Sequence, residues 1–238
     1  MKALKMGNGK NKTTSIPLTI KGKEQEPKVV TVNDKAATRQ AIINYLEKSL
    51  PIISNNKFLE RSDWHAKPPK GSLEEDWDYF GIVFHHQGNS PQHSCAAMHG
   101  SMKEVQDMHL SKYDDIGYHY AVSCTGEIAE GRDIRFKGSH VKNRNTGLIG
   151  VLLLGDYTEP GEAGIEDSWD ILYYNRRVPE TQWRSAVVLA HALTTYFNIK
   201  QLGGHREFAL STDDRTCPGN IAMPLIQKLR ASMGLGTP

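Results

Sequence analysis

The sequence feature that most constrains the fold is the almost purely apolar run from Leu148 to Leu154. A strand with one face in water alternates apolar and polar residues, whereas a strand covered on both faces stays apolar along its length. The run therefore predicts a central strand with other elements packed on both sides. A second short apolar run, from Tyr79 to His86, predicts another buried strand.

Helix-like segments alternate with these strands. Apolar residues recur at three- and four-residue steps between Pro91 and Leu110, and again from Pro179 to Phe197. A last helix is expected from Ile221 to Met233, and the residues on either side of Thr125-Gly126 are expected to pair as a hairpin. This order predicts an α/β fold with a mixed central β-sheet flanked by helices.

Residues 1–57 differ from the rest of the chain and are expected to form an N-terminal extension of a domain at residues 58–238. Polar residues dominate up to about Pro27, where the only expected element is a short edge strand at Ile16–Ile20. The long polar segment Asp156–Arg177 inside the domain is expected to be a functional or mobile loop.

One helix is expected within the N-terminal extension. Asn33 or Asp34 can cap it, and the following apolar residues fall near helical spacing. Pro51 is expected to end the helix, because proline lacks the backbone N–H that continues it. Two interpretations stay open, namely a lid packed on the domain and an element for docking or export.

Charge and hydropathy narrow the possible partners. The formal net charge is +2 with acids and bases nearly balanced, which gives no support for a general nucleic-acid binder. No apolar run approaches the length of a transmembrane segment. The first residues carry charge without an apolar core, so no secretory signal peptide is visible and synthesis in the cytoplasm is expected.

The three cysteines cannot all pair with one another. If Cys217 is a metal ligand, Cys95 and Cys124 remain. Cys95 lies near the start of an expected helix and Cys124 in a strand-like run. Buried structural thiols are favoured for both, and a disulfide between them is the alternative.

A candidate metal site lies near the C-terminus. His205 and Cys217 lie on one loop, 12 positions apart, with a Gly pair before the histidine and Pro-Gly after the cysteine. Imidazole and thiolate are ligands that zinc prefers, and a catalytic zinc site uses three protein ligands with one position open. The best third candidate is His85. Because consecutive strand residues point to opposite faces, His86 is expected to be a hydrogen-bonded core histidine.

These motifs resemble the type 2 N-acetylmuramoyl-L-alanine amidase family, which includes peptidoglycan recognition proteins and T7-type lysozyme amidases. The resemblance covers roughly Phe58 to the C-terminus, with seven stretches in the family's order. They are Arg61-Ser62-Asp63-Trp64, Ile82-Val83-Phe84-His85-His86, Asp115-Ile116-Gly117-Tyr118-His119-Tyr120, Gly126–Arg132, Gly138-Ser139-His140, Ile149-Gly150-Val151 and the His205/Cys217 loop. The resemblance implies the family's fold and a Zn²⁺ ion on His85, His205 and Cys217. It also implies hydrolysis of the amide between N-acetylmuramic acid and L-alanine of the peptidoglycan stem peptide.

The resemblance implies roles for further residues. Tyr118 matches a tyrosine whose hydroxyl lies beside the zinc in amidase-competent relatives, where it can bond the scissile carbonyl; the alternative is a packed core aromatic. Arg215 stands where relatives carry Lys or Thr, so it is expected to stabilise the oxyanion without carrying protons, or else to be a solvated loop residue. His140 either lines the groove and binds substrate or is structural. Arg61 and Trp64 are expected to be scaffold residues.

Two departures from the family pattern bear on function. The His205–Cys217 loop is longer than in the recognition proteins and the T7-type enzymes, so the insert Phe208–Thr212 is expected to reshape one wall of the groove. The strand Gly150–Leu154 lacks the glutamate that recycling-type amidases carry, which argues against a role in recycling.

The favoured function is a zinc amidase that acts on peptidoglycan or muropeptides. The alternatives are a zinc-bearing module that binds peptidoglycan without cutting it and an enzyme for another stem-peptide amide. The expected place of action is the periplasm or cell wall of a target cell. An antibacterial effector of a contact-dependent, type VI-like secretion machine, with a secretion component and an immunity protein as partners, is favoured over a phage endolysin. Residues 1–57 show no wall-binding repeat of the kind many endolysins append.

Overall fold

The structure is a computed structural model of the 238-residue chain. It describes residues 12–16, 19–20, 23–24, 28–32, 34–54, 57–88, 98–159, 161–162, 177–210 and 215–238. None of the helices in these ranges is both long enough and apolar enough to cross a membrane.

A six-stranded mixed sheet forms the centre of the domain. Its strands, in spatial order, are β10 (Gln201–Gly204), β6 (Gly81–His86), β9 (Leu148–Leu153), β7 (Tyr120–Val122), β8 (Ile128–Glu130) and β5 (Phe58–Leu59). Only the β7–β8 pair is antiparallel. All residues of β9 are buried, because other elements cover both faces of this inner strand. The mixed α/β fold expected from the sequence is confirmed.

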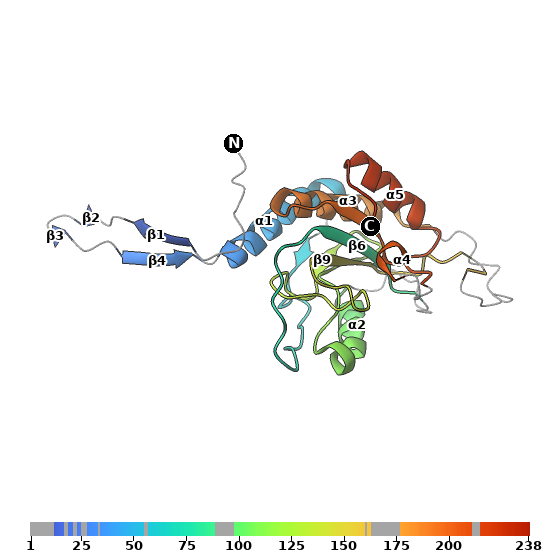
Figure 1. Cartoon of the computed structure of the whole chain (residues 1–238), viewed down its shortest axis with the longest axis horizontal. Helices are drawn as coiled ribbons and strands as arrows, with labels where there is room; N and C mark the ends of the chain where they lie inside the picture. Colours follow the sequence, from blue (N-terminus) through green and yellow to red (C-terminus); the bar gives the residue numbers. More distant parts are fainter. Residues whose placement is uncertain are drawn as a thin grey trace.

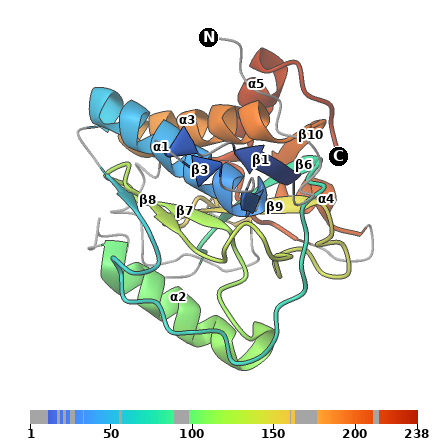
Figure 2. The ribbon, with the colours of Figure 1, turned by 90° about the vertical axis from the view of Figure 1, so that its left-hand side faces the viewer.

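Helices cover both faces of the sheet (Figure 1). One face carries α1 (Asp34–Ser54), α3 (Glu180–Tyr196) and α5 (Met223–Ser232). The opposite face carries α2 (Met98–Tyr113), which lies alone below the sheet in Figure 2. Successive residues of the inner strands pack in different apolar clusters. Val151 packs in the cluster that includes α1 and α3, and Leu152 packs in the cluster that includes α2. The alternation along a strand therefore builds two cores with one sheet.

The helix expected after Asn33 is present as α1, and it packs beside α3. Its residues Ile42, Ile43, Leu46 and Leu50 are buried in the same apolar cluster as α3. Arg39 adds ion pairs to Glu130 (2.6 Å) and to Glu60 (2.8 Å). This packing favours the interpretation as an element seated on the domain; docking or export stays a prediction.

Pro51 does not end α1, which continues to Ser54. The proline lies in the last turn with its ring exposed, so the missing N–H removes one hydrogen bond near a helix end and the ring meets solvent.

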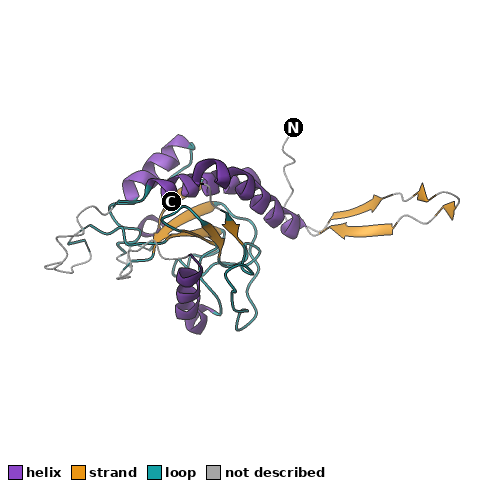
Figure 3. Ribbon diagram, turned by 180° about the vertical axis from the view of Figure 1, so that it is seen from behind, coloured by secondary structure: helices purple, strands orange, loops and turns teal. Residues whose placement is uncertain are grey.

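The N-terminal extension contains more strand than the sequence predicted. β1 (Lys12–Ile16) pairs antiparallel with β4 (Lys28–Val32), and β2 (Thr19–Ile20) pairs with β3 (Lys23–Glu24). Figure 3 shows this hairpin extending away from the central sheet. Of the strand expected at Ile16–Ile20, Ile16 ends β1 and Thr19–Ile20 form β2, while residues 17–18 lie outside the described residues. β1 and β4 were not expected, but their β-branched residues favour strands without an alternating pattern.

At the expected helical step Met108/His109 on α2, Met108 is 51% exposed and His109 is partly buried, so His109 takes the inner position. Cys124 is disulfide-bonded, so the buried thiol favoured for it is wrong. It lies partly exposed in the turn after β7, where its sulfur is not enclosed by the sheet. Cys95 and the rest of 91–97 lie outside the described residues, as does most of the Asp156–Arg177 loop.

Candidate metal centre

Three potential ligands meet where two parallel strands end. His85 lies at the end of β6, and His205 follows β10 directly as the first residue of the short helix α4 (His205–Phe208). Because Phe84 is opposite Gly204 in the β6–β10 register, the two histidines become neighbours. Cys217 comes from the loop that follows, and one ligand atom from each residue lies within 4.8 Å of the others.

The donor set fits a zinc ion. Zinc bonds of about 2.0–2.3 Å place the ligand atoms of a tetrahedral site roughly 3.5 Å apart. Cys217 Sγ lies 3.7 Å from His85 Nδ1. The imidazole rings of His85 and His205 have centroids 4.5 Å apart. Two imidazoles and one sulfur on this spacing leave one tetrahedral position for a further ligand.

Burial affects the protonation of two of the three potential ligands, His85 and Cys217. It lowers the pKa of His85 well below its usual value, and the neighbouring His205 and His140 lower it further. A neutral imidazole with a free lone pair is the form that binds a metal. Burial raises the pKa of the Cys217 thiol to about 12, although the backbone N–H of His86 and the charges of Arg206 and Arg215 oppose the rise. A metal ion that binds here therefore displaces the thiol proton.

Glycine lets the cysteine loop approach the strand. A Cβ atom on Gly204 would lie 2.5 Å from Met223 Sδ and 2.6 Å from Pro218 Cδ. Atoms do not approach so closely, so a side chain at this position would push away the loop that carries Cys217. The Gly pair before His205 thus has a packing reason in addition to its turn chemistry.

Arg206 and Glu162 hold the same loop from the other side. The backbone N–H of Arg206 donates to the carbonyl of Cys217 (2.9 Å), and its guanidinium donates to the Thr216 carbonyl and to Asn220 Oδ1 (2.7 Å). The same guanidinium pairs with Glu162. Sequence reasoning assigned no role to either residue; the position of Arg206 next to a metal-ligand candidate was the one available signal.

Tyr118 lies against the ligand cluster. The centroid of its ring is 4.9 Å from that of His85. Burial raises the pKa of its hydroxyl, and the nearby Cys217 raises it further. The hydroxyl therefore keeps its proton at neutral pH and is available as a hydrogen-bond donor beside the site.

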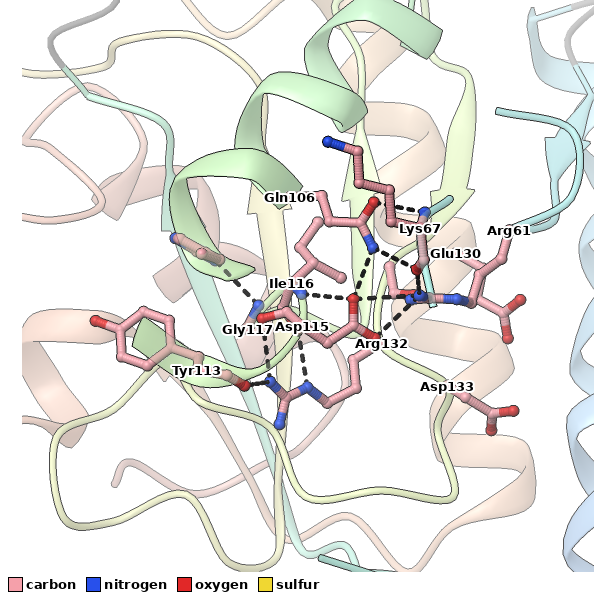
Figure 4. Close-up of polar contacts among 12 residues, drawn as sticks. Arg61, Lys67, Gln106, Tyr113, Asp115, Ile116, Gly117, Glu130, Arg132 and Asp133 are labelled. Carbon is pink, nitrogen blue, oxygen red and sulfur yellow. Dashed lines mark hydrogen bonds and ion pairs between the residues drawn. The ribbon is translucent and has the colours of Figure 1, made fainter. Parts of the chain in front are cut away.

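The loop before Tyr118 is held by Arg132, as Figure 4 shows. The guanidinium donates from Nε to the Ile116 carbonyl (2.8 Å) and from Nη2 to the Tyr113 carbonyl (2.8 Å). The backbone N–H of Arg132 donates to the carbonyl of Tyr118 itself (2.7 Å). A Cβ on Gly131 would lie 2.3 Å from this carbonyl oxygen, so glycine is required where the two segments meet.

Asp115 secures the same loop from within (Figure 4). Its carboxylate is almost fully buried and accepts from the backbone N–H of Ile116 (2.8 Å) and from Gln106 Nε2 on α2 (2.8 Å). The guanidinium of Arg61 forms an ion pair with the same carboxylate, and its Nη2 lies 3.0 Å from Asp115 Oδ2. Arg61, expected to be a scaffold residue, therefore contacts the loop that leads into Tyr118.

His140 and His86 are both buried near the ligands. His140 Nδ1 lies 3.1 Å from His85 Nε2, and His140 Nε2 lies 3.3 Å from the Leu148 carbonyl. Both of its nitrogens thus face protein groups, and substrate contact by His140 stays a prediction. His86 is buried and its Nδ1 accepts from the backbone N–H of Tyr157 (3.0 Å), as expected for a core histidine.

Arg215 and the insert lie at the edge of the described loop. Arg215 is exposed, and its charge lowers the pKa of Cys217, which places the guanidinium in electrostatic reach of the cluster. Its role on the oxyanion stays a prediction. Phe208 belongs to the core with Val83, because its ring is 2% exposed, so it does not form a groove wall. Leu210 is 43% exposed, and Ser211 and Thr212 lie outside the described residues.

Known proteins are similar to this chain in sequence. Residues 77–220 match the family model described as N-acetylmuramoyl-L-alanine amidase. Peptidoglycan-recognition protein SD of Drosophila melanogaster is 25% identical over 176 residues, which cover 72% of this chain and 84% of that protein. An N-acetylmuramoyl-L-alanine amidase of Sus scrofa is 33% identical over 112 residues, 44% of this chain but 19% of that longer protein.

Solved structures agree on the fold. The crystal structure of Drosophila PGRP-SD superposes with a TM-score of 0.59 at 23% identity, over 72% of this chain and 93% of that one. The endolysin amidase LysCS from Clostridium intestinale superposes with a TM-score of 0.57 at 20% identity, over 76% and 97% of the two chains.

Proposed function

The chain belongs to the N-acetylmuramoyl-L-alanine amidase family, and from that premise we propose that it is a zinc-dependent peptidoglycan hydrolase. The bond cleaved is the amide between N-acetylmuramic acid and the L-alanine of the stem peptide. The observation that carries the proposal is the cluster of His85, His205 and Cys217 with Tyr118 against it. A binding surface alone needs no such combination of metal ligands and a protonated phenol.

Each residue of the proposed site has a separate role in the reaction. His85, His205 and Cys217 would hold the ion. When bound, zinc supplies Lewis-acid chemistry, lowering the pKa of a water ligand and polarising an amide carbonyl. Tyr118, kept protonated by burial, donates a hydrogen bond to the carbonyl oxygen as that oxygen gains negative charge. Arg215 adds a permanent positive charge for the same oxygen and takes no part in proton transfer.

A second candidate function is peptidoglycan recognition without cleavage. It is favoured by the similarity to peptidoglycan-recognition protein SD, and a related fold, PGRP-LE, was solved in complex with tracheal cytotoxin, a monomeric diaminopimelic acid-type peptidoglycan. The presence of both Tyr118 and Cys217 favours the enzyme, because recognition by itself requires neither.

Digestion of purified cell wall separates these functions. The zinc-loaded protein is expected to lower the turbidity of a peptidoglycan suspension, and mass spectrometry is expected to find stem peptides that begin with free L-alanine. His205→Ala is the matched inactive control. Binding without cleavage would assign the recognition function, and fragments cut within the stem peptide would assign a different amide.

We further propose that the protein acts in the periplasm or cell wall of a target cell as an antibacterial effector, with a secretion component and an immunity protein as partners. The disulfide at Cys124 supports work in an oxidising compartment, since disulfides persist there and are rare in the cytosol. Phage endolysin is the alternative role. Killing of a second bacterial species on contact, and protection by co-expression of the gene next to this one, would test the effector role. Lysis that requires a phage holin and no contact would favour the endolysin.

A further inference from the structure

His140 lies behind the metal-ligand candidates in a slot between two glycines. A Cβ atom on Gly138 would lie 2.5 Å from His140 Cδ2, and a Cβ on Gly150 would lie 2.6 Å from the same atom. Real Cβ atoms do not approach a ring so closely, so neither position has room for a side chain. Gly150 belongs to the buried strand β9. The ring of His140 is therefore packed against the sheet, although its backbone belongs to the loop before β9.

The hydrogen bonds of His140 have a defined direction. The carbonyl of Leu148 can only accept, so the proton of the neutral His140 ring lies on Nε2, 3.3 Å away. Nδ1 then carries a lone pair and accepts from Nε2–H of His85 at 3.1 Å. This leaves the lone pair of His85 on Nδ1, which is the nitrogen that lies 3.7 Å from Cys217 Sγ. The tautomers follow from the donors and acceptors that meet.

We propose that His140 is a positioning residue that fixes the tautomer and ring orientation of His85 and so presents His85 Nδ1 to the metal. In the opposite tautomer, a proton on His85 Nδ1 would point at the ligand cluster and exclude the ion. Hydrogen-bonded partners of metal-bound histidines act in this way, and their loss costs about 10–100-fold in metal affinity.

This role accounts for features that substrate contact does not explain. It gives a reason for the glycines in Gly138-Ser139-His140 and Ile149-Gly150-Val151, since both make room for the His140 ring. It also engages both nitrogens of His140 inside the protein. The inference rests on the metal site of the proposed function and not on which bond the enzyme cleaves.

Zinc affinity, measured by competition with a chromophoric chelator, tests the inference with three variants. His140→Phe keeps a ring in the slot but removes the acceptor, and is expected to weaken zinc binding by about 10–100-fold. His140→Gln restores an acceptor oxygen and is expected to recover part of that loss. His119→Phe controls for packing, because His119 is a buried histidine beside His140 that bonds Tyr79 and the Gly150 N–H but no ligand candidate, and a smaller loss is expected. Unchanged affinity in His140→Phe, or a His140→Gln variant that binds zinc no better than His140→Phe, would overturn the proposal.

Nitrogen-15 NMR of the unsubstituted protein keeps the test independent of folding in the variants. The expected tautomers are Nε2–H for both His140 and His85, with His85 Nδ1 unprotonated in the metal-free protein and coordinated after zinc is added. A proton on His140 Nδ1, or coordination through His85 Nε2, would overturn the proposal. A protein that binds no zinc would instead refute the proposed metal site, while the metal-free spectrum still tests the hydrogen-bond relay.

Discussion

The two walls of the site are held in different ways. His85 lies near the end of β6, a strand between two neighbouring strands. The Nε2 atom of His85 bonds the ring of His140, which packs between two glycines. Tyr118 instead follows a loop without strand partners, and a set of charged side chains, Arg132 and Asp115 foremost, bonds the backbone of that loop. A sheet fixes its strand ends by its own ladder, whereas a loop needs side-chain anchors.

If the proposed function holds, this difference predicts that metal binding and turnover have separate supports. Substitutions in the ligand wall, which His85, His205 and Cys217 form, should remove the metal and with it all activity. Substitutions in the tyrosine wall, which Tyr118 and the loop before it form, should slow the reaction while the metal stays bound. Substitutions in the two walls can test whether these supports are separate.

The largest effect is expected for His205→Ala. The remaining His85 and Cys217 cannot complete a tetrahedral zinc site, so zinc binding and wall hydrolysis should both be lost. Metal analysis after dialysis against a weak chelator would measure zinc per chain, and the unsubstituted protein is expected to hold about one. A variant that keeps stoichiometric zinc would show that His205 is not a ligand.

Tyr118→Phe is expected to keep the zinc and lose turnover. The substitution removes only the hydroxyl, and loss of one oxyanion donor costs about 10²–10³ in kcat. Hydrolysis of a defined muropeptide and metal content would be measured on the same sample. Full activity in this variant would make Tyr118 a packing residue and would leave the tyrosine wall without a catalytic role.

Arg132→Lys is expected to lower kcat by about 10–100-fold with zinc content unchanged. The compact ammonium of lysine cannot reproduce the planar guanidinium that spans the carbonyls of Tyr113 and Ile116, and a small displacement of a catalytic group is enough for such a loss. If Arg132 acts through Tyr118, the same substitution should cost little in the Tyr118→Phe background. Additive losses in the double variant would contradict the positioning role, and Arg135→Lys, on a nearby surface ion pair with Asp133, is the matched control.

The smallest effect is expected at Arg215, since it is exposed and water screens its charge. Arg215→Ala should reduce kcat by about tenfold without loss of zinc, and Arg215→Lys should retain much of the activity because the positive charge remains. A rise in KM at constant kcat would instead make Arg215 a clamp on a substrate carboxylate. No change in either constant would make it a solvated loop residue.

Local pattern was enough for much of the fold. The apolar run at Leu148–Leu154 correctly predicted a buried inner strand. The prediction that a helix begins at Pro179 was also correct. The errors fell where neighbours outweigh the pattern. Pro51 is tolerated because its ring is exposed in the last turn of α1, and β1 forms although polar residues dominate the chain up to about Pro27.

Some residues of the candidate site could also be predicted from the sequence, and others could not. His85, His205 and Cys217 are recognisable in the sequence because their side chains are among the few that bind zinc, and their order matches a known family. Arg132, Asp115 and Glu162 could not be assigned roles, since their partners are mostly backbone carbonyls and N–H groups that acquire positions only on folding.

Apolar patterning and side-chain chemistry are local properties, so the sequence was enough to predict the class of the fold and the three proposed ligand residues. The pairing of β10 with β6, which makes His205 a neighbour of His85, emerges only on folding. The tertiary structure also decided that His140 faces His85 Nε2 and the Leu148 carbonyl. These are contacts between segments far apart in the chain, and no local period specifies which strands become neighbours or which way a buried ring turns.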